Sequence, residues 1–240
     1  MNNYIPKHEI DVISEGMIKL YFEKVRKKVE HRVDIEDFIT SFLGLKIEYV
    51  SFAEVDEGKV GFLSDGSSPL LICRSGEIIP FVFPEKTVVV EQSLLKESET
   101  GRRRFTLAHE AAHNILDRMN MADNKSEFYS KEDKEREYTL DEYKKMQSNV
   151  EYMADRMAAS LLMPAALVDN ALKKVLNVDK IKIYDEFIKE SDKLAIKKVA
   201  RYLGVSYSAL RIRLLDLNKL EMHPVTEYIS KELLLGGICG

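Results

Sequence analysis

The chain has 240 residues, 45% of them apolar, and its 40 acidic and 36 basic side chains give a formal net charge of −4. This length allows one large domain or two small ones with a packed core, and the charge balance excludes attraction of nucleic acid by the whole surface. A local basic patch remains possible. The two cysteines, Cys73 and Cys239, lie far apart in sequence and are expected to be free thiols in a reducing compartment.

Targeting signals are not evident in the sequence. The first residues lack the basic start and apolar stretch of a signal peptide, and no apolar run approaches the length of about 18 residues typical of a membrane-spanning helix. We therefore expect a cytoplasmic protein without a membrane partner.

Two amphipathic helices are predicted in the N-terminal segment, residues 1–44. The first covers residues 10–29, where apolar side chains recur with a period close to 3.6 residues. The second begins after Asp34, a plausible N-cap, and Gly44 should end it. Its apolar stripe consists of Ile35, Phe38, Ile39 and Phe42.

Residues 45–92 consist of short β-branched and aromatic runs separated by Gly, Pro, Asp and Ser, which predicts a small, mostly antiparallel sheet. An edge strand of such a sheet could pair with an extended peptide, or it could serve only as scaffold, and both remain open. Turns are expected at Asp65-Gly66 and Ser75-Gly76, and edge strands or bends at Pro80 and Pro84.

The following helix, for which Thr100 is the expected cap, contains His109-Glu110-Ala111-Ala112-His113. Histidines four residues apart project from one helix face, so a single cation could bridge His109 and His113. Zinc suits imidazole, requires a further protein ligand and leaves a position open for water in a catalytic site, where Glu110 is the candidate general base. The alternative is a surface helix with two unrelated histidines. However, its apolar flanks predict a buried helix, in which histidines and a carboxylate need partners.

The helix also begins with a cluster of positive charge, Arg102 to Arg104. Positive side chains in the first turn oppose the helix dipole, so carboxylates of the protein or of a substrate should compensate for them. After the helix, residues 119–147 are highly charged and poor in aliphatic side chains. They are expected to form a solvent-facing insertion, and a lid is the functional alternative.

A second helix with buried character is predicted from residue 150 to Pro164, which should end it. Glu151 and Asp155 share its apolar face, where two carboxylates need a cation or strong donors. Small residues at Ala154 and Ala158 would permit close approach to the histidine helix, placing Glu151 at the metal. Asp155 could then accept a hydrogen bond from the free ring nitrogen of a histidine. A surface carboxylate pair is the alternative.

The motif RRRFTLAHEAAHNIL, followed by EYMADRMAASLLMP, resembles the ImmA/IrrE family of zinc metallopeptidases, whose pattern is close to RFTLAHELGH with a later ExxAN-x-FAAxLLMP. The resemblance covers roughly residues 35–164 and implies a gluzincin-like site. It implies His109, His113 and Glu151 as zinc ligands and Glu110 as the catalytic base.

This chain departs from the family pattern at Ala111-Ala112 in place of Leu-Gly, at Asp155 in place of Asn, and at Asp117 in place of a further His. Asp155 resembles the Glu-xxx-Asp arrangement of other gluzincins, and Asp155 and Asp117 are the candidates for supporting the ligands.

After Pro164 the chain is expected to be helical, with short amphipathic segments at residues 165–175 and 181–189. Two helices near residues 194–203 and 209–215, joined by a turn at 204–206, resemble a helix-turn-helix. Six basic side chains and one acidic side chain lie between residues 195 and 220, a local basic patch that could meet DNA phosphates. Arg211 and Arg213 are the candidate DNA-binding residues, but the family resemblance favours packing or substrate docking of these helices over contact with DNA.

These observations predict an α+β protein in which a small, mostly antiparallel sheet packs on zinc-binding helices, as in zincins. Residues 1–44 would form an N-terminal helical segment, residues 45–164 the zinc metallopeptidase domain, and residues 165–240 a C-terminal helical domain with the helix-turn-helix-like segment. Together, motif and resemblance predict a zinc-dependent endopeptidase that makes a limited cleavage in a protein partner. The resemblance implies a helix-turn-helix transcriptional repressor as that partner.

Two questions remain open at the level of sequence. The donor that stabilises the oxyanion of the reaction could be Tyr129, Tyr138, Tyr143, Tyr152 or Arg156. The alternative function is a DNA-binding transcriptional regulator with an inactive peptidase-like domain. The intact Glu110 and the intact ligand positions argue against that alternative.

Overall fold

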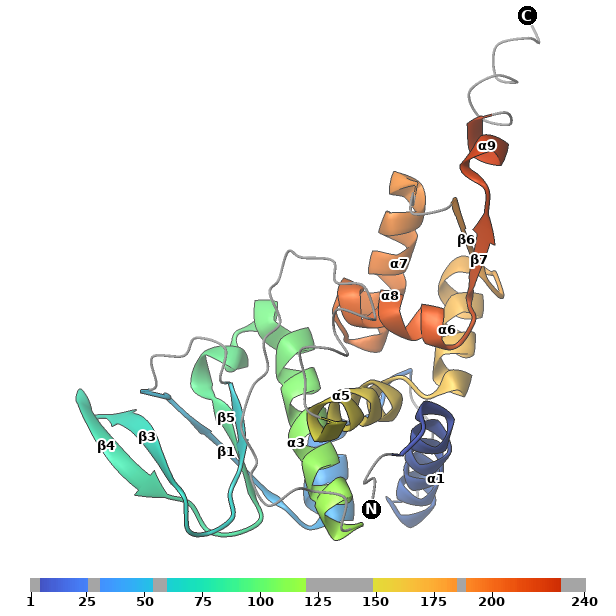
Figure 1. The fold of residues 1–240 in the computed structure, drawn as a ribbon. Helices are drawn as coiled ribbons and strands as arrows, with labels where there is room; N and C mark the ends of the chain where they lie inside the picture. The colour runs from blue at the N-terminus through green and yellow to red at the C-terminus, as the bar shows by residue number, and fades with distance from the viewer. Residues whose placement is uncertain (1–4, 26–30, 54–59, 120–148, 185–188, 230–240) are drawn as a thin grey trace, which may run out of the picture. The chain divides into compact units, whose positions relative to one another are not determined.

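The computed structural model describes residues 5–25, 31–53, 60–119, 149–184 and 189–229 (Figure 1). The fold is mixed α+β, and the chain divides into two compact units, Met1–Pro164 and Ala165–Gly240. Within the described ranges, none of the helices has the length and apolar character needed to cross a membrane. The predicted insertion at residues 119–147 falls almost entirely outside the described residues.

The two predicted N-terminal helices are present. Helix α1 spans Lys7–Val25, and residues 26–29 of the predicted helix lie outside the described residues. Helix α2 spans Ile35–Asp37 and follows the predicted cap, Asp34, whose Oδ1 accepts a hydrogen bond from the Asp37 N–H at 3.2 Å. The helix then widens into a π-helix, η1 (Phe38–Leu43), before Gly44 ends it with a φ of 73°. This wider turn, which a 3.6-residue pattern does not reveal, buries Leu43 and leaves Phe42 only partly buried.

The sheet of the first unit is mixed rather than mostly antiparallel. Strands β1 (Lys46–Val50), β5 (Thr87–Glu91) and β2 (Gly61–Leu63) form a sheet in the order β1-β5-β2. Strand β2 runs antiparallel to β5 as predicted, but β1 runs parallel to β5. Short strands separated by turn residues are typical of antiparallel pairing, whereas the parallel partner of β1 lies about 40 residues further along the chain.

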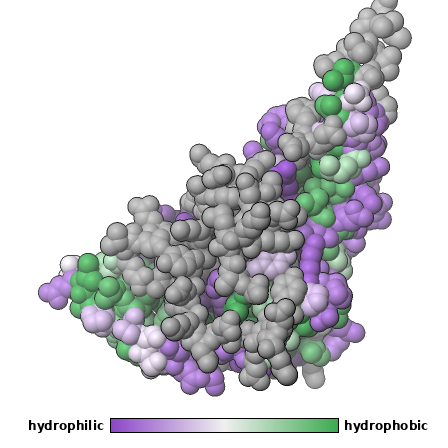
Figure 2. All heavy atoms as spheres, viewed as in Figure 1, coloured by the Kyte–Doolittle hydropathy of each residue, from purple (hydrophilic) through white to green (hydrophobic). Residues whose placement is uncertain are grey.

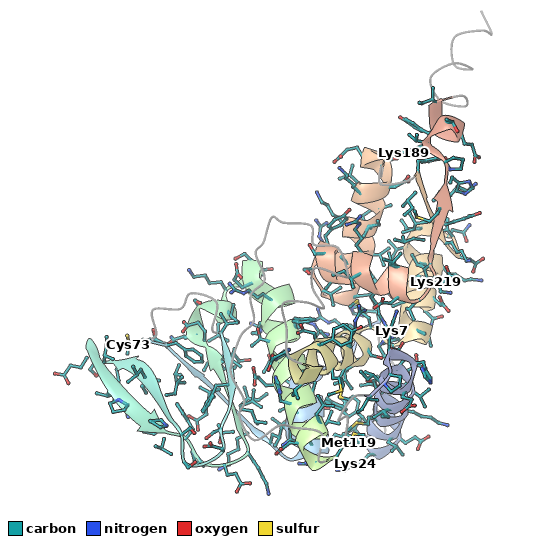
Figure 3. All side chains as sticks on the ribbon, viewed as in Figure 1. Lys7, Lys24, Cys73, Met119, Lys189 and Lys219 are labelled. Carbon is teal, nitrogen blue, oxygen red and sulfur yellow. The ribbon has the colours of Figure 1, made fainter. Side chains whose placement is uncertain are left out.

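Strands β3 (Pro69–Arg74) and β4 (Glu77–Val82) form a separate antiparallel hairpin. Its two-residue turn is the predicted Ser75-Gly76, and the positive φ angles of 54° and 86° fit a type I′ turn. Pro80 lies in β4, an edge strand of this hairpin, as expected. The outer face of the hairpin exposes Leu71, Ile78, Val82 and Cys73. Figure 2 shows apolar surface over the hairpin, and Figure 3 labels Cys73 there.

The three-stranded sheet is covered on both faces. Alternate side chains of a strand point to opposite faces, and Phe62 and Val89 pack with Leu70 and Ile72 of the hairpin on one of them. The other face, to which Gly61 belongs, lies against helix α3 (Thr100–Arg118). The sheet therefore presents the backbone of β2 directly to the helix that carries the two histidines.

The start of α3 differs from the prediction, because Thr100 is its first residue and not its cap. The Thr100 hydroxyl donates a hydrogen bond to the Glu97 carbonyl at 2.7 Å. The positive charges of the first turn are partly compensated by internal groups, as one alternative predicted. Arg104 is buried and donates to the Val33 carbonyl at 2.7 Å, and Arg103 Nε lies 3.6 Å from a carboxylate oxygen of Glu36.

Helix α5 (Asn149–Leu162) packs against α3 and also against α1. It ends just before Pro164, as predicted. Five alanines of α3 and α5 have no exposed surface, which allows the two helices to approach closely: Ala108, Ala111, Ala112, Ala154 and Ala158. This close packing brings the face that carries Glu151 and Asp155 against the histidine helix.

The second unit contains α6 (Ala165–Leu176), β6 (Ile181–Tyr184), α7 (Glu190–Leu203), α8 (Tyr207–Asp216), β7 (Leu220–His223) and α9 (Val225–Tyr228). Strands β6 and β7 pair in parallel, so the helix predicted at residues 181–189 is wrong. The start of β6 alternates between the buried Ile181, the exposed Lys182 and the buried Ile183, which is the period of a strand. Residues 185–188 lie outside the described residues.

Helices α7 and α8 and the turn between them occur where the sequence predicts them. Gly204 ends α7 with a left-handed φ of 70°, and the Ser206 hydroxyl caps α8 by accepting a hydrogen bond from the Ala209 N–H at 3.1 Å. The basic residues of this region differ in exposure: Lys197, Lys198 and Arg201 are exposed, whereas Arg213 is only 2% exposed.

Candidate metal centre

Two imidazoles and one carboxylate converge where α3 packs on α5. The Nε2 atoms of His109 and His113 are 2.9 Å apart. One oxygen of Glu151 lies 3.2 Å from His109 Nε2, and the other lies 3.3 Å from His113 Nε2. Candidate ligand atoms of all three residues lie within 4.8 Å of one another. Among the residues that the structure describes, this is the single cluster of its kind.

The second ring nitrogen of His109 is held by Asp155, one turn after Glu151 on α5. His109 Nδ1 lies 2.8 Å from Asp155 Oδ1. A carboxylate at Nδ1 favours the tautomer that carries its proton there and leaves Nε2 free to accept a metal ion. Asp155 therefore fixes both the ring orientation and the side of the ring that faces Glu151.

The charges of the cluster shift the pKa values of its members in opposite directions. Burial alone would lower the pKa of His109, but the hydrogen bond and charge of Asp155, together with Glu151 and Glu110, raise it well above its usual value. Burial likewise opposes ionisation of Glu151, yet its contacts with the two histidines lower its pKa to about 2. In the metal-free protein the cluster thus favours the protonated form of His109, which lies between the carboxylates of Asp155 and Glu151.

We expect the free energy of unfolding of the metal-free protein to fall as the pH rises above about 6.5. The raised pKa of His109 means that its protonated form stabilises the folded state. That contribution is complete below its ordinary pKa of 6.5 and is lost as the pH passes through the higher folded-state value. The contribution of Glu151 changes only between pH 4.5 and about 2, well below this window.

Urea unfolding of zinc-free protein between about pH 6 and pH 9 measures this effect. The matched control is Asp155→Asn, which removes the carboxylate that raises the pKa of His109 and should flatten the profile. A zinc-free stability that increases with pH over this range would contradict the expected protonation of the cluster.

Glu110 lies beside the cluster and is only 4% exposed. Burial raises its pKa, and the nearby histidines partly offset this shift. The backbone N–H of Leu63 in β2 donates a hydrogen bond to the carboxylate. The oxygen Oε2 is buried and has no hydrogen-bond partner among the described residues. The carboxylate is therefore held by β2 through a hydrogen bond, and its Oε2 makes no hydrogen bond with the described residues.

Several other predicted site residues do not join this group. Asp117 is exposed, and its side chain makes no hydrogen bond or ion pair with the described part of the chain. Tyr152 and Arg156 are buried on α5, with the Arg156 guanidinium 5.3 Å from the centre of the Tyr152 ring. The remaining candidate oxyanion donors, Tyr129, Tyr138 and Tyr143, lie outside the described residues.

The two candidate DNA-binding arginines occupy different environments. Arg211 is partly buried, whereas Arg213 is almost completely buried. Contact of these residues with DNA stays a prediction, and the burial of Arg213 argues against it. Arg213 lies next to the buried Leu214 and three residues after the buried Leu210, on the face of α8 that packs inward.

Sequence reasoning did not identify the contribution of β2 to this site. Gly61 and Leu63 lie against Glu110, although they precede it by more than 45 residues. A usable signal was present in the run KVGFLS, because an isolated glycine within a strand pattern indicates close approach of another group to the backbone.

The sheet packs on a helix that carries two histidines one turn apart, and a second helix supplies a carboxylate. This arrangement defines the domain as metallopeptidase-like. The IrrE N-terminal-like domain, Peptidase_M78, matches residues 94–215. The chain therefore belongs to this family, and the predicted relationship to ImmA/IrrE metallopeptidases is confirmed. The comparison with curated proteins found no match.

Proposed function

We propose that this protein is a zinc-dependent endopeptidase that makes a limited, regulatory cleavage in a protein partner. The observation that carries the proposal is the convergence of His109, His113 and Glu151 beside the buried Glu110. The family assignment supports the same chemistry, because the matched domain is a peptidase domain.

The donor set fits zinc. Two imidazole nitrogens and one carboxylate are a common ligand set of catalytic zinc, and three protein ligands leave a coordination position for water or substrate. His109 and His113 present Nε2 atoms to the same point, and Glu151 places an oxygen near each of them. The unbonded Oε2 of Glu110 offers an acceptor for a water molecule at that open position.

Bound zinc would supply a Lewis acid that acidifies water and polarises the scissile carbonyl. Glu110 would accept the proton of the attacking water and transfer it to the leaving amine. Burial raises the pKa of Glu110, which makes its carboxylate a stronger base toward the proton of water than a carboxylate in solvent. Asp155 would keep His109 in the ligand tautomer.

For the substrate, we propose a helix-turn-helix transcriptional repressor in the cytoplasm, as the family resemblance implies. A narrow specificity suits a protease in that compartment, since unrestricted cleavage would damage the cell. The candidate donors for the oxyanion within the described residues are Tyr152 and Arg156, which lie one and five positions after Glu151 on α5.

The alternative, a DNA-binding regulator with an inactive peptidase-like domain, has less support. One of its two candidate contacts, Arg213, is buried, and the grouping of His109, His113 and Glu151 supports the peptidase proposal instead. The exposed Lys197, Lys198 and Arg201 of α7 remain available to it. A gel shift that is lost at higher salt would favour this alternative.

Metal analysis and a cleavage assay together test the proposal. The purified protein should bind about one zinc ion per chain. The zinc-loaded protein should cut a small repressor encoded by a neighbouring gene, and the chelator 1,10-phenanthroline should stop the reaction. A protein that holds no zinc even after reconstitution would overturn the proposal.

A further inference from the structure

Strand β2 presents its backbone donors to Glu110 along the edge that does not pair with β5. The Ser64 N–H donates to the Thr87 carbonyl at 2.9 Å, and the Glu91 N–H donates to the Val60 carbonyl at 3.0 Å. Since donors alternate between the two edges of an antiparallel strand, the N–H groups of Gly61 and Leu63 point to the opposite edge. Among the described strands β2 has no second neighbour there, and the Leu63 N–H donates to Glu110 instead.

Gly61 allows this close approach because it has no side chain. A methyl group at its Cα would lie 2.5 Å from Glu110 Oε1 and 2.6 Å from Thr106 Cγ2, both far inside van der Waals contact. Both neighbours are buried, and the β-branched Thr106 is stiff at χ1. Gly61 does not have a positive φ, so its backbone conformation does not require glycine. The contact with α3 is what requires it.

We propose that Gly61 and the Leu63 N–H form a seat for the Glu110 carboxylate, and that Gly61 is a positioning residue for it. The seat holds one carboxylate oxygen against β2, and Oε2 has no hydrogen-bond partner within the described ranges of the chain. Its catalytic consequence rests on the proposed peptidase function, whereas the seat itself is a property of the metal-free protein. A larger residue at position 61 must displace the carboxylate or push β2 away from α3.

Amide hydrogen exchange of the full-length, zinc-free protein tests the seat without an activity assay. The Leu63 amide should be protected although it lies at a free edge, and Gly61→Ala should speed its exchange about tenfold or more. Glu110→Ala should have the same effect, whereas Glu110→Gln, whose amide oxygen can still accept, should preserve protection. The Ser64 amide, bonded to β5, is the internal control and should not change.

Unchanged protection of Leu63 in both Gly61→Ala and Glu110→Ala would refute the seat. If Gly61→Ala does not fold, the Glu110→Ala and Glu110→Gln pair tests the same hydrogen bond with the native glycine in place. Adding Thr106→Ser to Gly61→Ala removes one of the two collisions and should partly restore the protection of Leu63.

Kinetics test the positioning role. With a fluorogenic peptide taken from the cleaved repressor, Gly61→Ala should lower kcat about 100-fold, the effect of a catalytic group misplaced by about 1 Å, while KM and zinc content stay unchanged. Phe62→Leu is the matched control: it weakens β2 from the opposite face and should lower stability but not kcat. An unchanged kcat in Gly61→Ala would refute the positioning role.

If the wild-type protein cuts no peptide, the proposed function fails, while hydrogen exchange still decides whether the seat exists.

Discussion

Glu110→Gln is expected to lower kcat by about 10²–10⁴-fold while the protein still binds about one zinc ion per chain. The amide has nearly the same shape as the carboxylate and can still accept the Leu63 hydrogen bond, but it cannot take up a proton from water. Cleavage of the repressor and metal content, measured on the same preparation, separate these two effects.

Glu110→Ala is the companion variant, because it removes both the proton acceptor and the contact with β2. It should be as inactive as Glu110→Gln but should also lose protection at Leu63. Cleavage by Glu110→Gln at the wild-type rate would show that another group accepts the proton, and it would leave the metal site itself unaffected.

Glu151→Gln is expected to weaken zinc binding by more than about 100-fold, beyond the ~10–100-fold range for residues that only orient ligands. The substitution removes the negative charge that pairs with both histidines in the metal-free protein and should offset the charge of the bound ion. Competition of the protein with a chromophoric zinc chelator measures this affinity.

Asp155→Asn is the matched control for that experiment, since Asp155 lies one turn along the same helix and contacts His109 only through Nδ1. Its effect should stay within the ~10–100-fold range. If Asp155→Asn weakened zinc binding as much as Glu151→Gln, the assignment of Glu151 as ligand and Asp155 as its support would be wrong.

Local patterns predicted the elements that carry the site. The spacing of His109 and His113 and the small-residue face of α5 were sufficient to place Glu151 and Asp155 beside them, because both patterns depend on helix periodicity alone. The Ser75-Gly76 turn and the cap at Asp34 also follow from chemistry within a few residues.

Features that depend on distant contacts were not predicted. The parallel β1–β5 and β6–β7 pairs join segments separated by other elements, and short strands such as β6 give too few residues to separate a period of two from one of 3.6. The burial of Arg213 and the contact of Gly61 with Glu110 are tertiary effects. Sequence alone can indicate an unusual glycine, but it cannot name the group that lies against it.

The candidate ligands come from two helices, and 38 positions separate His113 from Glu151. A metal ion shared by α3 and α5 would therefore act as a cross-link that exists only in the folded chain. By mass action, free zinc at 100 times its dissociation constant would add about 2.7 kcal/mol to the free energy of unfolding. Zinc scarcity would then do more than slow the enzyme: it would increase the unfolded fraction exposed to cellular proteases, so the metal supply would also set how much of the protein a cell retains.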